Sequence, residues 1–207
     1  MDLFALIADE RRGLADLLEG FDDQQWATPS LCAGWTVQTV AGHLTAGWNV
    51  SIPRFVISIA RYRGFDRAND HLAKGLGERP PAEIVADLRD HADHRFTPPG
   101  LGPEAPLADL LLHGLDIRRP LGLARALPAD RVETVLGLLT SKKGQQAAPP
   151  GGIGGLTFRA TDLSWTSGEG PEVAGTGEAL LLGLAGRKAG LDELTGEGAA
   201  AFRDRFA

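Results

Sequence analysis

Residues 107–122, LADLLLHGLDIRRPLG, carry the strongest helical signal in the chain. Leucine and isoleucine recur there at the spacing of one helix face, and the pattern stops at Pro120, which predicts a buried helix. Asp109 and His113 are four residues apart, so on this helix their side chains stack on one face. A carboxylate oxygen and an imidazole nitrogen then converge on one point, as two ligands of one metal ion do.

A second apolar, helix-like stretch, TVQTVAGHLTAGW at residues 36–48, contains His43. We expect His43 to supply a third ligand from a facing helix. Two nitrogens and one oxygen suit zinc, and a three-ligand site leaves a position open for water, a thiol or a substrate. Simpler roles stay open at this point: His43 as a buried histidine with one hydrogen bond, and Asp109 as a solvated residue or the partner of Arg118 or Arg119.

Asp116 follows His113 at i+3. It is interpreted as a cap, a partner of Arg119, or an outer carboxylate that orients an imidazole, and not as a direct metal ligand. Cys32 is interpreted as a small buried residue, because no base at a recognisable spacing accompanies it as it would a nucleophile.

Three further helical patterns precede residue 107. They cover residues 2–20, residues 36–62 with a bend or break near Pro53, and residues 80–96. Thr36 is a suitable N-cap for the second of them. Four helices in succession, with no convincing strand among them, predict a helical bundle over residues 1–125, and such bundles place metal sites in their interior.

The second half of the chain, residues 126–207, has a different sequence pattern, in which strand signals appear beside helical ones. Alternating apolar residues at 156–165, separated by turn formers, predict short antiparallel strands. The predicted helices are one in 128–143, one of about a dozen residues in 178–190, and a terminal one in 197–207, and the biased segment 145–155 is predicted to be a loop. The expected fold class is therefore α+β in two domains, a four-helix bundle followed by a small α+β domain.

Composition excludes several classes of function. The chain of 207 residues has a net charge of −6, so it does not offer the general attraction to phosphate on which nucleic-acid binding depends. No apolar run approaches the roughly 20 residues that span a bilayer, so no membrane span is expected. The single cysteine precludes an internal disulfide, and the start lacks the features of a secretory signal, which predicts a cytoplasmic protein. Whether it is a monomer or a homodimer stays open.

Three stretches in this order carry a resemblance to a known family: LCAGWTVQTVAGHL at 31–44, LADLLLHGLDIRRPLG at 107–122, and LTFRATDLSWTSGEGPEVAGTGEALLLGLAGR at 156–187. With them the chain resembles, nearly end to end, the mycothiol-dependent maleylpyruvate isomerase family. The N-terminal half of that family belongs to the larger DinB-like superfamily of metal-binding four-helix proteins. The resemblance implies a DinB-like bundle over residues 1–125 and the family's small C-terminal domain over residues 126–207.

The resemblance also implies site residues. The two histidine ligands of the family fall on His43 and His113, and its carboxylate ligand falls on Asp109. That ligand is usually a glutamate, so this chain departs from the family by one methylene, which shortens the reach of the oxygen. The arginine that the isomerase uses falls on Arg187, in LAGR. Similar enzymes of actinobacteria use the low-molecular-weight thiol mycothiol, held by zinc.

The function implied is that of a mycothiol-dependent metalloenzyme with a divalent metal, zinc, and mycothiol as thiol cosubstrate. A metal-bound thiol loses its proton near neutral pH and can add to a small electrophile, as an isomerase or a transferase. Arg187 would hold an anionic substrate through its carboxylate, and the second domain would close over the site. Two alternatives stay open: a non-catalytic small-molecule or thiol-binding protein that lost its metal through the change to Asp109, and a metal-dependent hydrolase in which water replaces the thiol.

Overall fold

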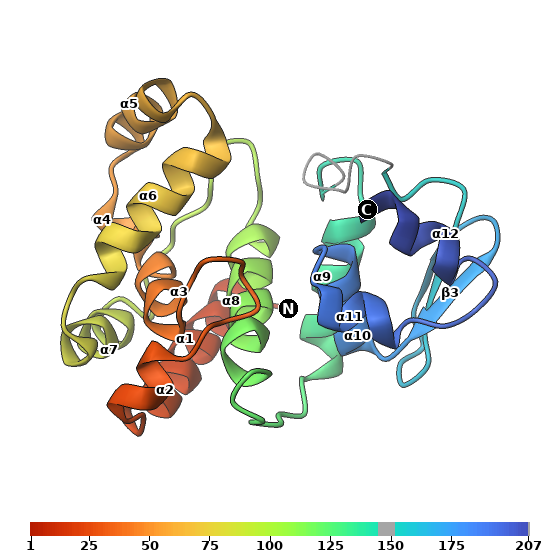
Figure 1. Cartoon of the computed structure of the whole chain (residues 1–207), viewed down its shortest axis with the longest axis horizontal. Helices are drawn as coiled ribbons and strands as arrows, with labels where there is room; N and C mark the ends of the chain where they lie inside the picture. The colour runs from red at the N-terminus through yellow and green to blue at the C-terminus, as the bar shows by residue number, and fades with distance from the viewer. Residues whose placement is uncertain (145–151, 207) are drawn as a thin grey trace. The chain divides into compact units, whose positions relative to one another are not determined.

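The computed structural model describes residues 1–144 and 152–206, and most of the predicted loop at 145–155 therefore lies outside the described residues. The chain divides into two compact units, Met1–Ala124 and Arg125–Ala207 (Figure 1). The first unit is helical, and the second combines helices with a small sheet. The α+β fold class is confirmed.

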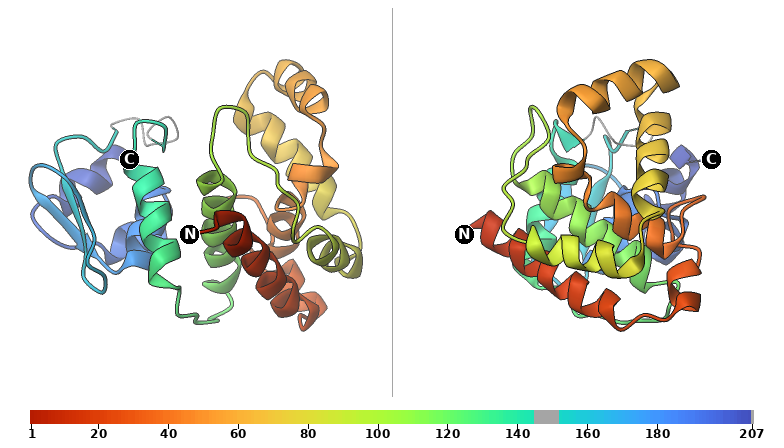
Figure 2. Two further views of the ribbon diagram at one scale, coloured as in Figure 1. Left: turned by 180° about the vertical axis from the view of Figure 1, so that it is seen from behind. Right: turned by 90° about the vertical axis from the view of Figure 1, so that its left-hand side faces the viewer.

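The helices of the N-terminal unit are α1 (Leu3–Glu19), α2 (Asp23–Ala27), α3 (Val37–His43), α4 (Ala46–Asn49), α5 (Ile52–Tyr62), α6 (Phe65–Gly77), α7 (Pro81–Asp90) and α8 (Glu104–Arg118). Helix α1 packs against α7 and α8, and α3 packs against α6, α7 and α8 (Figure 2). Helix α8 contributes the most to this core: Leu107, Leu111 and Ile117 are at most 2% exposed.

The expected second helix over residues 36–62 is interrupted twice. Thr36 caps its first segment as predicted, because its hydroxyl accepts a hydrogen bond from the Thr39 N–H. Helix α3 ends at His43, and after the short α4 the backbone becomes extended at Val50. Helix α5 then begins after its N-cap, Ser51. A proline lies in its first turn, where the missing N–H would have had no partner within the helix. Helix α6 was not expected, and the buried residues of this helix are mostly small.

A half-buried carboxylate ties α7 to the segments around α4 and α6. Asp87 accepts hydrogen bonds from Arg79 Nη1 at 2.7 Å, Trp48 Nε1 at 2.8 Å and Asn49 Nδ2 at 2.6 Å. Its side chain is 14% exposed. Burial by itself would raise the pKa of Asp87, but the hydrogen bonds from Arg79, Asn49 and Trp48 outweigh burial and hold that pKa below its ordinary value of 3.8.

Asp87→Asn is expected to lower the free energy of unfolding by about 2 kcal/mol, because the amide keeps the shape but weakens three hydrogen bonds that are now made to a charge. A depressed pKa adds stability that is present above the ordinary value and is lost as pH falls through the lower, folded value. Urea unfolding of both proteins from pH 7 down to pH 3 measures this. The difference between them should shrink only at the acid end, and an equal difference at every pH would contradict the assignment.

The C-terminal unit contains α9 (Ala129–Thr140), β1 (Thr157–Ala160), β2 (Thr166–Gly168), β3 (Glu172–Gly175), α10 (Gly177–Leu184), α11 (Lys188–Glu193), α12 (Ala199–Arg203) and a final 3₁₀ turn, η2 (Asp204–Phe206). The strand order is β2-β1-β3. Strand β1 runs antiparallel to β2 and parallel to β3, so the sheet is mixed and the expectation of a purely antiparallel sheet is wrong. The expected helix at 178–190 is two helices, because Gly186 has a φ of 74° that ends α10.

Among the described helices, none combines the length and the apolar character that crossing a membrane requires.

Candidate metal centre

Two helices of the N-terminal unit bring His43, Asp109 and His113 together. His43 is the last residue of α3, and Asp109 and His113 lie one turn apart on α8. Helix α3 is held at close range to α6 by paired glycines: a Cβ at Gly42 would lie 2.6 Å from the backbone nitrogen of Gly77. Without side chains at these two positions, the two backbones approach closely, and this packing positions the last turn of α3, which carries His43.

The geometry of the three side chains fits a shared cation. One ligand atom from each residue lies within 4.8 Å of the other two. Asp109 Oδ1 is 3.6 Å from His43 Nε2 and 3.4 Å from His113 Nε2. Those separations are longer than good hydrogen bonds. They are close to the roughly 3.3 Å that separates two ligands bound 2.0–2.1 Å from one tetrahedral zinc ion. The donor set and its spacing therefore suit a divalent metal.

Burial and exposure differ across the site. The side chains of His43 and His113 are 13% and 11% exposed, whereas that of Asp109 is 45% exposed. The indole of Trp35 lies beside both imidazoles, with ring centroids 5.2 Å from His43 and 6.1 Å from His113. Its Nε1 donates to Asp70 Oδ1 at 2.8 Å, which fixes the ring. The imidazoles are thus packed in place, while the carboxylate side of the site is open to solvent.

The electrostatics of the site favour a positive charge. Burial opposes protonation of His113, but attraction to the charge of Asp109, aided by the hydrogen bond to Asp116, raises the pKa of His113 well above its ordinary value. Desolvation also opposes ionisation of Asp109, yet the charges of His43 and His113 hold the pKa of that carboxyl well below its ordinary value. The same negative field attracts a metal cation.

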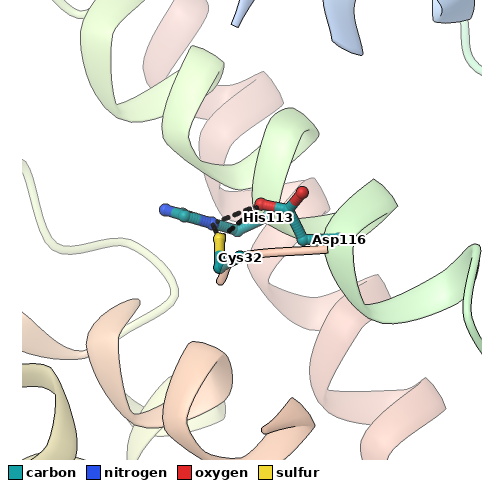
Figure 3. A group of neighbouring side chains, drawn as sticks. All are labelled: Cys32, His113 and Asp116. Carbon is teal, nitrogen blue, oxygen red and sulfur yellow. Dashed lines mark hydrogen bonds and ion pairs between the residues drawn. The ribbon is translucent and has the colours of Figure 1, made fainter. Parts of the chain in front are cut away.

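The far side of the His113 ring has its own partners. His113 Nδ1 lies 2.9 Å from Asp116 Oδ2, and Cys32 Sγ lies 3.0 Å from the same oxygen and 3.6 Å from His113 Nδ1 (Figure 3). Of the roles expected for Asp116, this geometry is that of a carboxylate that binds the imidazole. Cys32, interpreted from the sequence as a small buried residue, is half-buried, and an imidazole and a carboxylate lie beside its thiol. Its neighbours lie 81 and 84 residues along the chain, so no local spacing could have revealed them.

Arg187 lies in the C-terminal unit. It occupies the N-cap position of α11, its backbone N–H donates to Leu182 O, and its Nη1 donates to Ala185 O at 2.9 Å. These bonds fix the residue at the turn between α10 and α11. Its role toward a substrate stays a prediction.

Comparisons with known proteins identify a family model and a fold. Residues 7–106 match the model of the mycothiol maleylpyruvate isomerase N-terminal domain. The fold is similar to a crystal structure of the mycothiol-dependent maleylpyruvate isomerase, with a TM-score of 0.58 and 18% identity over 96% of each chain. A histidine-to-alanine mutant of a mycothiol-dependent maleylpyruvate isomerase gives a TM-score of 0.53 and 19% identity over 96% of each chain. At these identities the two likenesses show the fold. No curated protein matches the chain in sequence.

Proposed function

The N-terminal unit belongs to the mycothiol maleylpyruvate isomerase N-terminal domain family, and from this premise we propose that the chain is a mycothiol-dependent metalloenzyme. The observation that carries the proposal is the meeting of His43 Nε2, Asp109 Oδ1 and His113 Nε2 within 4.8 Å of one another. We propose that these three atoms hold zinc. The shorter Asp109 serves in place of the usual glutamate because it already lies at ligand spacing from both imidazoles.

Each residue of the proposed zinc site has its own role. Zinc bound there would lower the pKa of a thiol and so supply a nucleophile near neutral pH. His43 and His113 stay neutral to bind the metal, and packing against Trp35 restricts their rings. Asp109 adds one negative charge, and its exposed side leaves room for the thiol of mycothiol to approach. Three protein ligands with an open fourth position are typical of catalytic rather than structural zinc.

The reaction proposed is addition of the mycothiol sulfur to a small electrophile. In an isomerisation the sulfur would add to a carbon–carbon double bond conjugated to a carbonyl, and the electron pair of that double bond would move onto the carbonyl oxygen as an enolate. The resulting single bond would rotate, and the sulfur would leave as the enolate forms the double bond again. In a transfer the enolate would instead take up a proton, and the thioether would be the product. Arg187 would bind a substrate carboxylate through two parallel hydrogen bonds. We further propose that the protein works in the cytoplasm.

The test is a rate measurement with maleylpyruvate, the substrate in the name of the similar enzyme. Purified protein without a histidine tag would be assayed with and without mycothiol, and after removal and return of zinc. We expect isomerisation that needs both. If mycothiol binds equally well to the metal-free protein and no electrophile is consumed, the proposal is wrong and the chain is a thiol-binding protein. Activity that needs zinc but not mycothiol would identify a hydrolase.

A further inference from the structure

Asp116 is a fully buried carboxylate at the back of the candidate metal centre. Its side chain is 0% exposed, and it lies on α8 three residues after His113. Burying a carboxylate is costly unless donors surround it. Its Oδ2 has two partners within 3.0 Å, His113 Nδ1 and Cys32 Sγ. Such an arrangement requires an explanation beyond packing, since an apolar residue would fill the same space at lower cost.

The two nitrogens of His113 face different groups. Nδ1 faces Asp116 (Figure 3). Nε2 faces Asp109 and, through it, His43. A neutral imidazole carries one proton. A carboxylate accepts hydrogen bonds and cannot donate one, and a carboxylate faces each nitrogen. Asp116 lies 2.9 Å from Nδ1, at hydrogen-bond distance, whereas Asp109 lies 3.4 Å from Nε2, longer than a good hydrogen bond, so Asp116 draws the proton to Nδ1 and leaves the lone pair of Nε2 free. Only the Nδ1–H tautomer offers a metal ligand at Nε2.

Cys32 secures this carboxylate from a separate segment of the chain. Its backbone N–H donates to Ser30 Oγ at 3.1 Å, and the neighbouring Leu31 N–H donates to the backbone oxygen of Asp116 at 3.1 Å. The loop before α3 is thereby tied to α8 at Asp116. Its thiol then donates to the same Oδ2 that receives His113 Nδ1–H.

We propose that Asp116, supported by the Cys32 thiol, is the positioning residue of the metal centre: it fixes His113 as the Nδ1–H tautomer and points Nε2 at the ligand position. This inference rests on the proposed function. It makes Asp116 a residue that acts on the metal through His113, and it gives Cys32 a supporting role that involves neither catalysis nor direct ligation.

The distances between ligand atoms show whether Cys32, His113 and Asp116 could themselves bind the metal. Cys32, His113 and Asp116 also have ligand atoms within 4.8 Å of one another. However, the contacts of Asp116 Oδ2 are 2.9 and 3.0 Å, the lengths of hydrogen bonds, and fall below the roughly 3.3 Å or more expected between two ligands of one zinc ion. The separations around Asp109, 3.4 and 3.6 Å, match the zinc value. The metal therefore belongs on the Nε2 side.

The test measures zinc affinity by competition with a chelator in wild-type protein, Asp116→Asn, Cys32→Ala and Cys32→Ser. We expect Asp116→Asn to weaken zinc binding about 10- to 100-fold, because an amide also stabilises the wrong tautomer. Cys32→Ala should weaken zinc binding less, and Cys32→Ser, which keeps a donor, should restore it. Asp87→Asn is the matched control: it destabilises the fold but should leave zinc affinity unchanged.

Two spectroscopic measurements keep the test decisive if a variant fails to fold. Imidazole nitrogen NMR of metal-free wild-type protein, at alkaline pH where the ring is neutral, should show the proton of His113 on Nδ1, whether or not the protein binds zinc. A proton on Nε2 would overturn the proposal. So would a thiolate-to-cobalt charge-transfer band in cobalt-loaded protein without mycothiol, if Cys32→Ser removes that band. If the wild-type protein binds no zinc but His113 carries its proton on Nδ1, the proposed function is wrong. The contact by which Asp116 orients His113 would still stand.

Discussion

His113→Ala should abolish stoichiometric zinc binding and, with it, all mycothiol-dependent activity. Among the described residues, His113 alone belongs to both clusters of ligand-type side chains, with Nε2 toward Asp109 and Nδ1 toward Asp116. Loss of a partner behind a ligand typically costs 10- to 100-fold in metal affinity, so loss of the ligand itself should cost more than about 100-fold. Metal content of the purified protein and competition with a chelator measure the effect.

The matched control for His113→Ala is His71→Ala. His71 is exposed on α6, where its ring lies 4.3 Å from that of Tyr62. Removing an imidazole there should leave both zinc content and activity at the wild-type level. If His113→Ala and His71→Ala retain the same zinc content, the metal centre is not where we propose it to be.

Gly42→Ala should unfold or strongly destabilise the N-terminal unit. A Cβ at this position would lie 2.6 to 2.8 Å from backbone atoms of Leu76 and Gly77, and backbone cannot rotate away as a side chain can. Helices α3 and α6 would have to separate, and His43, the next residue along, would move with α3. Overpacking typically costs about 1 to 3 kcal/mol and at times more. Because the clash is with backbone, we expect a cost at the upper end of that range, about 3 kcal/mol, and after the gain of about 1 kcal/mol in helix propensity a net loss of about 2 kcal/mol. Urea unfolding measures it.

Gly75→Ala is the control on the same helix as Gly77. Gly75 is exposed on α6, and a Cβ there would meet no atom within 4 Å. This substitution should stabilise the protein by about 0.5 to 1 kcal/mol, because alanine loses less conformational freedom in a helix than glycine does. Equal effects of the two substitutions would show that the crossing of α3 and α6 is not closely packed.

Much of the fold could be predicted from the sequence because its strongest elements carry a clear pattern. The buried stripe around Leu107 and Leu111 identifies α8, and Thr36 marks the start of α3. Helix α6 was missed because its buried face is mostly small, with Ala68 and Ala73 packed where a longer apolar residue would have given a signal. The parallel pairing of β1 with β3 depends on contacts between separate segments, and alternation within a strand does not specify a partner.

Part of the candidate site could also be predicted from the sequence, and part could not. The i, i+4 spacing of Asp109 and His113 follows from helix geometry alone, so their convergence could be predicted. That His43 lies opposite them depends on how α3 packs on α8, and the resemblance to a family supplied it. The neighbourhood of Cys32 could not be inferred, because it arises where the loop before α3 meets the end of α8. The part in metal binding of His43, Asp109 and His113, and the part of Arg187 in substrate binding, stay predictions.

Anomalous diffraction from crystals grown with zinc is the most direct test of the central claim, that His43, Asp109 and His113 share one metal ion. We expect a single anomalous peak about 2.0 to 2.2 Å from His43 Nε2, His113 Nε2 and a carboxylate oxygen of Asp109, with Asp116 still bound to His113 Nδ1. A peak beside Cys32 Sγ and His113 Nδ1, or no peak within reach of His43, would contradict the claim.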